Sequence, residues 1–212
     1  MHTPDGLLHP WMAGAFLVLS GAVLLAAASR VRESLTEHRI QLFAVVAAAV
    51  FAAQMLNWPI PGGTSAHFVG GAFAAIVLGP HLGAFAVALV VAVQALIFGD
   101  GGTLSLGANV WNMAIVQAYV GYAVYAALED RSEALATVAG GWVGITAAAA
   151  SAGLQLGVSP GFGGEFLTVM AVMVGGHAVL GIGEGILTLA GTRLLARAGV
   201  DTEELRFGAV HA

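Results

Sequence analysis

Two of the seven histidines stand in settings that favour metal binding. His2 directly follows Met1, and His67 closes the glycine-rich stretch PGGTSAH at 61–67. Imidazole is a frequent ligand of nickel, copper, zinc and iron. The Met1 amine, the His2 amide nitrogen and one His2 ring nitrogen can close two fused chelate rings on one metal, and His67 can add a fourth nitrogen. Four nitrogens in a plane suit Ni(II), Co(II) or Cu(II), whereas calcium and magnesium prefer oxygen.

This chelate depends on how the chain starts, because it needs a free amine on Met1 and a deprotonated amide at His2. Residues 1–9 are polar or mixed and contain no basic n-region. We therefore expect no secretory signal and no cleavage, so that Met1 is retained. The alternative is that His2 is an ordinary exposed terminal residue.

The other titratable candidates have simpler interpretations. We expect His38, in an arginine-rich loop, and His211, next to the last residue, to be solvated. His81 is expected at a membrane interface. His177 and Glu184 fall within the last apolar segment, where an ionisable residue is a functional candidate. For these two residues a structural hydrogen-bonded pair is expected instead.

The composition predicts an integral membrane protein. The 212 residues are 58% hydrophobic and 9% charged, with a mean hydropathy of +0.89. A soluble domain carries about 25% charged residues. The chain has no cysteine, which excludes disulfides and thiolate metal sites. Long Ala/Val/Leu/Gly stretches approach the roughly 20 residues that span a bilayer.

Seven apolar segments predict seven transmembrane helices in one domain over residues 1–212, with an N-terminal loop at 1–9 and a tail at about 198–212. Their approximate ranges are 10–29, 40–56, 65–79, 82–98, 106–128, 134–156 and 166–196. Seven crossings place all seven arginines on one side: Arg30, Arg32, Arg39, Arg131, Arg193, Arg197 and Arg206. The positive-inside rule makes that side cytoplasmic, so the N-terminus is expected outside a cell (plasma) membrane.

Four stretches resemble the substrate-specific (S) subunits of cobalt/nickel energy-coupling factor (ECF) importers, the CbiM/NikM family. They are MHTPDGLL at the start, FAAQMLNWPIPGGTSAHFVGG (51–71), LGANVWNM (106–113) and GHAVLGIGEGILT (176–188). Thr3 replaces the usual Ile, and Ala66 stands where Gly is common. The resemblance implies an all-α core of six helices plus one added N-terminal helix. It also implies a square-planar metal held by Met1, His2 and His67.

The sequence also suggests residues around this site. Asn57, Thr64, Ser65 and Asn109 are candidates to orient the ligating imidazoles, because such rings usually donate their other N–H to an oxygen. Loop capping through side-chain to backbone hydrogen bonds is the alternative for each.

Ala44, Ala48 and Ala52 form a stripe of small residues on one helical face. Such stripes let helices approach closely in lipid. The resemblance implies docking on the transmembrane coupling (T) subunit, and packing within the protein is the alternative.

The sequence therefore predicts a substrate-binding subunit that captures Ni(II) or Co(II), without a prosthetic group, in an ATP-driven importer. No G-x-x-x-x-G-K-[ST] motif is present, so ATP hydrolysis is assigned to separate ATPase subunits. The resemblance implies those subunits, the T subunit and a small accessory membrane subunit as partners. Membrane lipid is also expected, and no nucleic acid. The choice between nickel and cobalt stays open.

Two rival functions belong to other classes. A carrier driven by an ion gradient would need ionisable groups along its path, for which only His177 and Glu184 are available. An intramembrane hydrolase would use Ser65 or Ser105 with His67 or His177. Ser65 and His67 are only two residues apart, and no G-x-S-x-G motif is present, so the sequence disfavours an enzyme.

Overall fold

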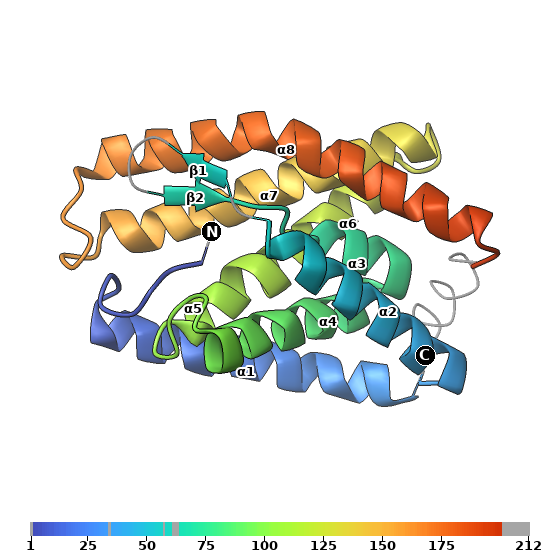
Figure 1. The fold of residues 1–212 in the computed structure, drawn as a ribbon, viewed down its shortest axis with the longest axis horizontal. Helices are drawn as coiled ribbons and strands as arrows, with labels where there is room; N and C mark the ends of the chain where they lie inside the picture. Colours follow the sequence, from blue (N-terminus) through green and yellow to red (C-terminus); the bar gives the residue numbers. More distant parts are fainter. Residues whose placement is uncertain (1, 34, 57, 61–63, 201–212) are drawn as a thin grey trace.

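A computed structural model describes residues 2–33, 35–56, 58–60 and 64–200, with side chains for residues 2–32, 35–56 and 67–200. The chain folds into long helices that run back and forth along one axis (Figure 1). The elements in order are α1 (Pro10–Glu33), α2 (Glu37–Gln54), β1 (Trp58–Ile60), β2 (Thr64–Ala66), α3 (Gly71–Leu78), α4 (Pro80–Val93), η1 (Gln94–Phe98), α5 (Leu106–Asn109), η2 (Val110–Val116), α6 (Gln117–Leu128), α7 (Glu133–Gly157) and α8 (Phe166–Arg197).

The described helices form seven continuous stretches, because the π-helical turns η1 and η2 continue α4 and join α5 to α6. The prediction of a mostly helical membrane fold is confirmed. Four of the described helical stretches are long and apolar enough to cross a membrane: Pro10–Arg32, Pro80–Phe98, Glu133–Gly157 and Phe166–Arg197.

The predicted start of the third helical segment, 65–79, is wrong. Residues 64–66 form strand β2, which pairs antiparallel with β1, and Trp58 lies opposite Ala66. Helix α3 begins only at Gly71, after Gly70 adopts a φ of 76°. This left-handed conformation is easy for glycine and uncommon for other residues. The backbone between the hairpin and α3 therefore stays extended.

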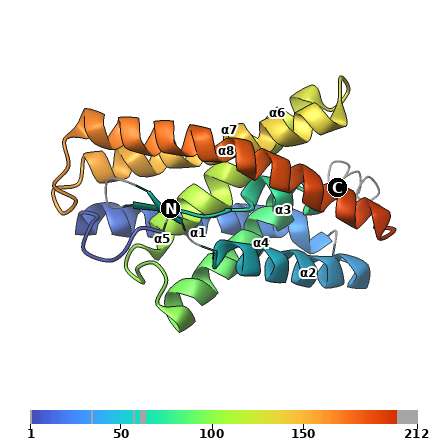
Figure 2. The ribbon, with the colours of Figure 1, turned by 45° about the horizontal axis from the view of Figure 1, so that its top comes forward.

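Helix α3 forms the centre of the packing, and all of its residues, Gly71–Leu78, are buried. It contacts α2, α4, α6, α7 and α8. Gly79, with a φ of 83°, ends α3, and Pro80 at once begins α4. Helices α7 and α8 pack side by side along one side of the molecule, and α2 and α4 lie on the other (Figure 2).

Two predictions about α2 can be compared with its burial. Arg39 was expected in the arginine-rich loop before the second segment, but it lies within α2, is buried, and donates from its guanidinium to the Leu78 carbonyl at 3.0 Å. Ala44, Ala48 and Ala52 are all exposed on α2. The stripe therefore lies on an exposed face of α2.

Candidate functional site

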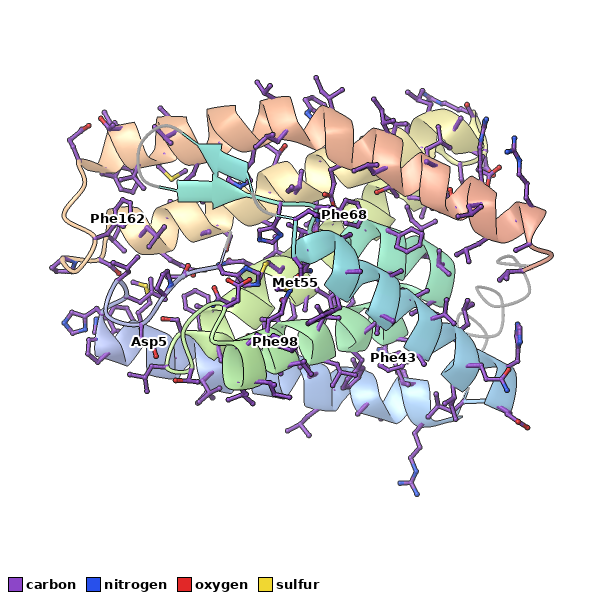
Figure 3. The ribbon with its side chains drawn as sticks, viewed as in Figure 1. Asp5, Phe43, Met55, Phe68, Phe98 and Phe162 are labelled. Atoms are coloured by element: carbon purple, nitrogen blue, oxygen red, sulfur yellow. The ribbon has the colours of Figure 1, made fainter. Side chains whose placement is uncertain are left out.

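The N-terminal segment, residues 2–9, is fixed to the loop before α5. The Asp5 carboxylate accepts the backbone N–H groups of Thr103, Leu104 and Ser105 at 3.1, 2.9 and 3.0 Å, together with the Thr103 hydroxyl. Burial raises the pKa of Asp5, but these hydrogen bonds outweigh it, and the pKa is lowered overall. Figure 3 shows Asp5 on this segment, next to the loop before α5.

Asn109 holds the segment deeper inside the protein. Its Oδ1 accepts the Thr3 N–H at 2.8 Å, and its Nδ2 donates to the Thr3 carbonyl at 3.1 Å. Asn109 is 0% exposed and Thr3 is 3% exposed. Through these two bonds Asn109 holds the backbone of Thr3 and not an imidazole. This is the role that the loop-capping alternative describes.

The His2 side chain, which is 5% exposed, lies next to the end of α4. Its Nε2 lies 3.1 Å from Gln94 Oε1, and its Nδ1 lies 3.6 Å from an Asp100 carboxylate oxygen. Because the Gln94 oxygen can only accept, it favours the tautomer in which Nε2 carries the proton and Nδ1 the lone pair. Burial lowers the pKa of His2 to about 4, so the ring is neutral at pH 7.

His67 lies directly against His2. The ring centroids are 4.7 Å apart and the ring planes differ by 17°. His67 Nδ1 lies 2.9 Å from the Phe68 carbonyl oxygen, which places the lone pair of the neutral ring on Nε2. His67 is 3% exposed, and burial holds its pKa well below 6.5. The fold thus brings together two neutral imidazoles from positions far apart in the sequence.

The remaining predicted candidates have different outcomes. Met1, Asn57 and His211 lie outside the described residues, and Thr64 and Ser65 belong to β2 by their backbone. The Ser105 hydroxyl donates to the Pro4 carbonyl at 3.2 Å. His38 is exposed, and His81 is half-buried with Nδ1 2.7 Å from the Tyr119 hydroxyl.

The expected pair between His177 and Glu184 is wrong. His177 Nδ1 bonds the Met173 carbonyl at 2.8 Å. The Glu184 carboxylate instead accepts from Val69 N–H, Gly70 N–H and Gln117 Nε2. Seven residues along one helix separate the two positions by about 10 Å, which is too far for a direct hydrogen bond.

Sequence reasoning missed Gln94 and Asp100, the side chains next to His2, and Gln54 and Gln117, which reach the backbone after His67. The available signal was a buried amide within an apolar helical segment: Gln54, Gln94 and Gln117 are each 0% exposed. No cluster of three His, Cys, Asp or Glu side chains suited to a metal occurs in the described part of the chain. A site here would need backbone nitrogens in addition to the two imidazoles.

This fold is that of a membrane transporter for transition metals. Two solved structures, described as a truncated transition metal transporter and a transition metal transporter, each match with a TM-score of 0.88. The first is 34% identical and covers 93% of this chain and 99% of its own, and the second is 33% identical and covers 98% and 97%.

The sequence comparisons identify the family. The family described as "Cobalt uptake substrate-specific transmembrane region", CbiM, matches residues 2–202, and this chain belongs to it. A protein of Archaeoglobus fulgidus, provisionally named fused nickel transport protein NikMN, is 52% identical over 96% of this chain and 68% of its own length. The cobalt transport protein CbiM of Acetoanaerobium sticklandii is 31% identical over 92% and 84%. The chain is therefore a nickel or cobalt transport protein of the membrane and not an enzyme.

Proposed function

We propose that this chain is the substrate-binding subunit of an ECF importer and captures Ni(II) or Co(II) through nitrogen ligands. The ligands are the Met1 amine, the amide nitrogen and Nδ1 of His2, and Nε2 of His67. The observation that carries this proposal is the buried stacking of His2 on His67, with ring centroids 4.7 Å apart. Both rings are neutral, which is the form that binds a metal.

The surrounding residues support this role. Gln94 and the Phe68 carbonyl each lie within hydrogen-bond distance of one ring nitrogen, and each favours the tautomer in which the other nitrogen of that ring carries the lone pair. The N-terminal segment is held by Asp5 on the loop before α5 and by Asn109 of α5, so that binding needs little further ordering of the chain. The Asp100 carboxylate, 3.6 Å from His2 Nδ1, offsets part of the charge of a divalent cation.

Transport then requires partners. The sequence has no phosphate-binding motif for ATP and no lysine, so separate ATPase subunits hydrolyse ATP. A T subunit couples them to this chain and docks on the exposed face of α2 that carries Ala44, Ala48 and Ala52. A small accessory membrane subunit completes the complex. Displacement of the N-terminal segment releases the metal inward.

The orientation follows from the arginines. The end of α1, the starts of α2 and α7 and the end of α8 lie at the same end of the molecule, to the right in Figure 1. Six arginines lie in or next to these helix ends: Arg30, Arg32, Arg39, Arg131, Arg193 and Arg197. This end is cytoplasmic by the positive-inside rule, so the metal site opens outward.

The test is a metal titration of purified protein with and without one alanine added before Met1. The extension removes the amine from its chelating position, so high-affinity binding of Ni(II) and Co(II) should be lost while the thermal midpoint is kept. The matched control carries the same alanine after Ala212. Unchanged affinity in the N-terminal variant would exclude the amine as a ligand. Uptake by cells without ATPase and T subunits would instead favour a gradient-driven carrier.

A further inference from the structure

Three buried side chains from three helices converge on the short segment that follows His67. Gln54 of α2 and Gln117 of α6 are 0% exposed, and Glu184 of α8 is 3% exposed. Their targets are the backbone groups of residues 69–71, between His67 and the first turn of α3. We call these three side chains the 69–71 clamp.

The clamp satisfies every amide N–H of that segment. Glu184 accepts Val69 N–H at 3.0 Å and Gly70 N–H at 2.8 Å, and Gln117 Oε1 accepts Gly71 N–H at 2.8 Å. Gln117 Nε2 in turn donates to Glu184 at 2.7 Å, which links α6 to α8. Because these three side chains are buried, each lost partner would leave a buried polar group unsatisfied.

A further contact connects the clamp to α2. Gln54, the last residue of that helix, donates from Nε2 to the Val69 carbonyl at 2.6 Å. Gly71 packs so closely on Gln117 that an added Cβ would lie 2.5 Å from its Oε1. The backbone of residues 69–71 is thus held from three sides, with little space to shift.

We propose that Glu184, Gln117 and Gln54 are positioning residues for the metal-binding imidazole of His67. This inference rests on the proposed function. His67 is joined to the clamped backbone through Phe68 alone, whose carbonyl also accepts its Nδ1–H. The clamp therefore sets the position and orientation of the His67 ring relative to the His2 ring. It also ties His67 to α2, the helix with the exposed alanine stripe, so a shift of α2 moves the Val69 backbone.

The test compares full-length wild type with Glu184→Gln, which keeps the side-chain shape but turns an amide donor toward an N–H group of the clamped backbone. Ni(II) is titrated, and its visible d–d spectrum is recorded at saturation. Loss of such an orienting contact should weaken Ni(II) binding about 10- to 100-fold. The spectrum should also shift, because a misplaced His67 changes the ligand field. A side chain that only stabilises the fold would lower the thermal midpoint and leave the spectrum of the bound metal unchanged.

Thr192→Val is the matched control, because Thr192 is also a buried polar residue of α8 but bonds only the Leu189 carbonyl of its own helix. It should leave both affinity and spectrum unchanged. If Glu184→Gln does not fold, Gln54→Leu takes its place with the same expected result. If wild type binds metal and the Glu184→Gln or Gln54→Leu protein has the same affinity and spectrum, the inference is overturned and the proposed function is not. Wild type that binds no Ni(II) or Co(II), or binds them equally after His67→Ala, would overturn the proposed function as well.

Discussion

Replacing Asn109 by alanine should weaken metal binding by detaching the N-terminal segment from α5. The side chain makes both a 2.8 Å bond from Thr3 N–H and a 3.1 Å bond to the Thr3 carbonyl. Both residues are almost fully buried, so the substitution leaves the Thr3 N–H without a partner. The Thr3 carbonyl keeps one donor, the Gly102 N–H at 3.1 Å.

The expected size follows from these contacts. A buried polar group that loses its partner costs about 1–3 kcal/mol. If this cost falls on docking of the segment that carries His2, the dissociation constant for Ni(II) should rise about 5- to 150-fold at 25 °C. The assay is a competition titration with a metal chelator of known affinity, together with a thermal midpoint for each protein.

Asn112→Ala is the matched control. Asn112 lies one turn further along the same continuous helix, is also 0% exposed, and exchanges two hydrogen bonds with Gln155, at 3.0 and 2.8 Å. Asn112 makes no hydrogen bond to the described part of the N-terminal segment, so its substitution should lower stability without changing the affinity for metal. Equal losses of affinity in Asn109→Ala and Asn112→Ala would refute the reasoning, as would an unchanged affinity in Asn109→Ala.

Three further outcomes are expected. Gln94→Leu removes the acceptor of His2 Nε2 and should weaken Ni(II) binding about 10- to 100-fold, whereas Gln94→Glu, which keeps an acceptor, should retain most of it. Asp5→Asn should reduce metal affinity severalfold. Because the folded pKa of Asp5 is lowered, the contribution of Asp5 to the stability of wild type should be present above pH 3.8 and lost as the pH falls further. The folded pKa of His2, lowered to about 4 mainly by burial, predicts that its contribution to stability is complete above pH 6.5 and is lost between pH 6.5 and 4, as thermal midpoints across that range would measure. A midpoint that rises over that interval as the pH falls would contradict the His2 prediction.

The helical architecture could be predicted from the sequence because it depends on local composition. Runs of apolar residues mark the helices, since backbone polar groups in lipid must be satisfied within the helix. The boundary at residues 64–70 could not be predicted in this way. Its residues are partly apolar, but their backbone groups bond the opposite strand and the side chains of distant helices.

The candidate ligands His2 and His67 were also visible in the sequence, through the unusual position of one and the glycine-rich setting of the other. Most of the residues that hold these two histidines in place could not be recognised in the sequence. Gln94, Asp100 and Glu184 act through contacts between positions that are 92–115 residues apart in the sequence. His177 and Glu184 share a helix and looked like a natural pair, yet His177 bonds the backbone of its own helix and Glu184 bonds the backbone before α3.

By itself, then, the amino-acid order established that this chain belongs in a membrane and, apart from residues 64–70, where its helices lie. It also singled out two imidazoles as candidate metal ligands. Folding alone decided that those imidazoles stack, which nitrogen of each ring keeps its lone pair, and which carboxylate and amides fix the backbone behind them. The reason is physical: hydropathy and helix formation act over a few neighbouring residues, whereas a hydrogen bond in a dry interior depends on where three or four helices place their side chains.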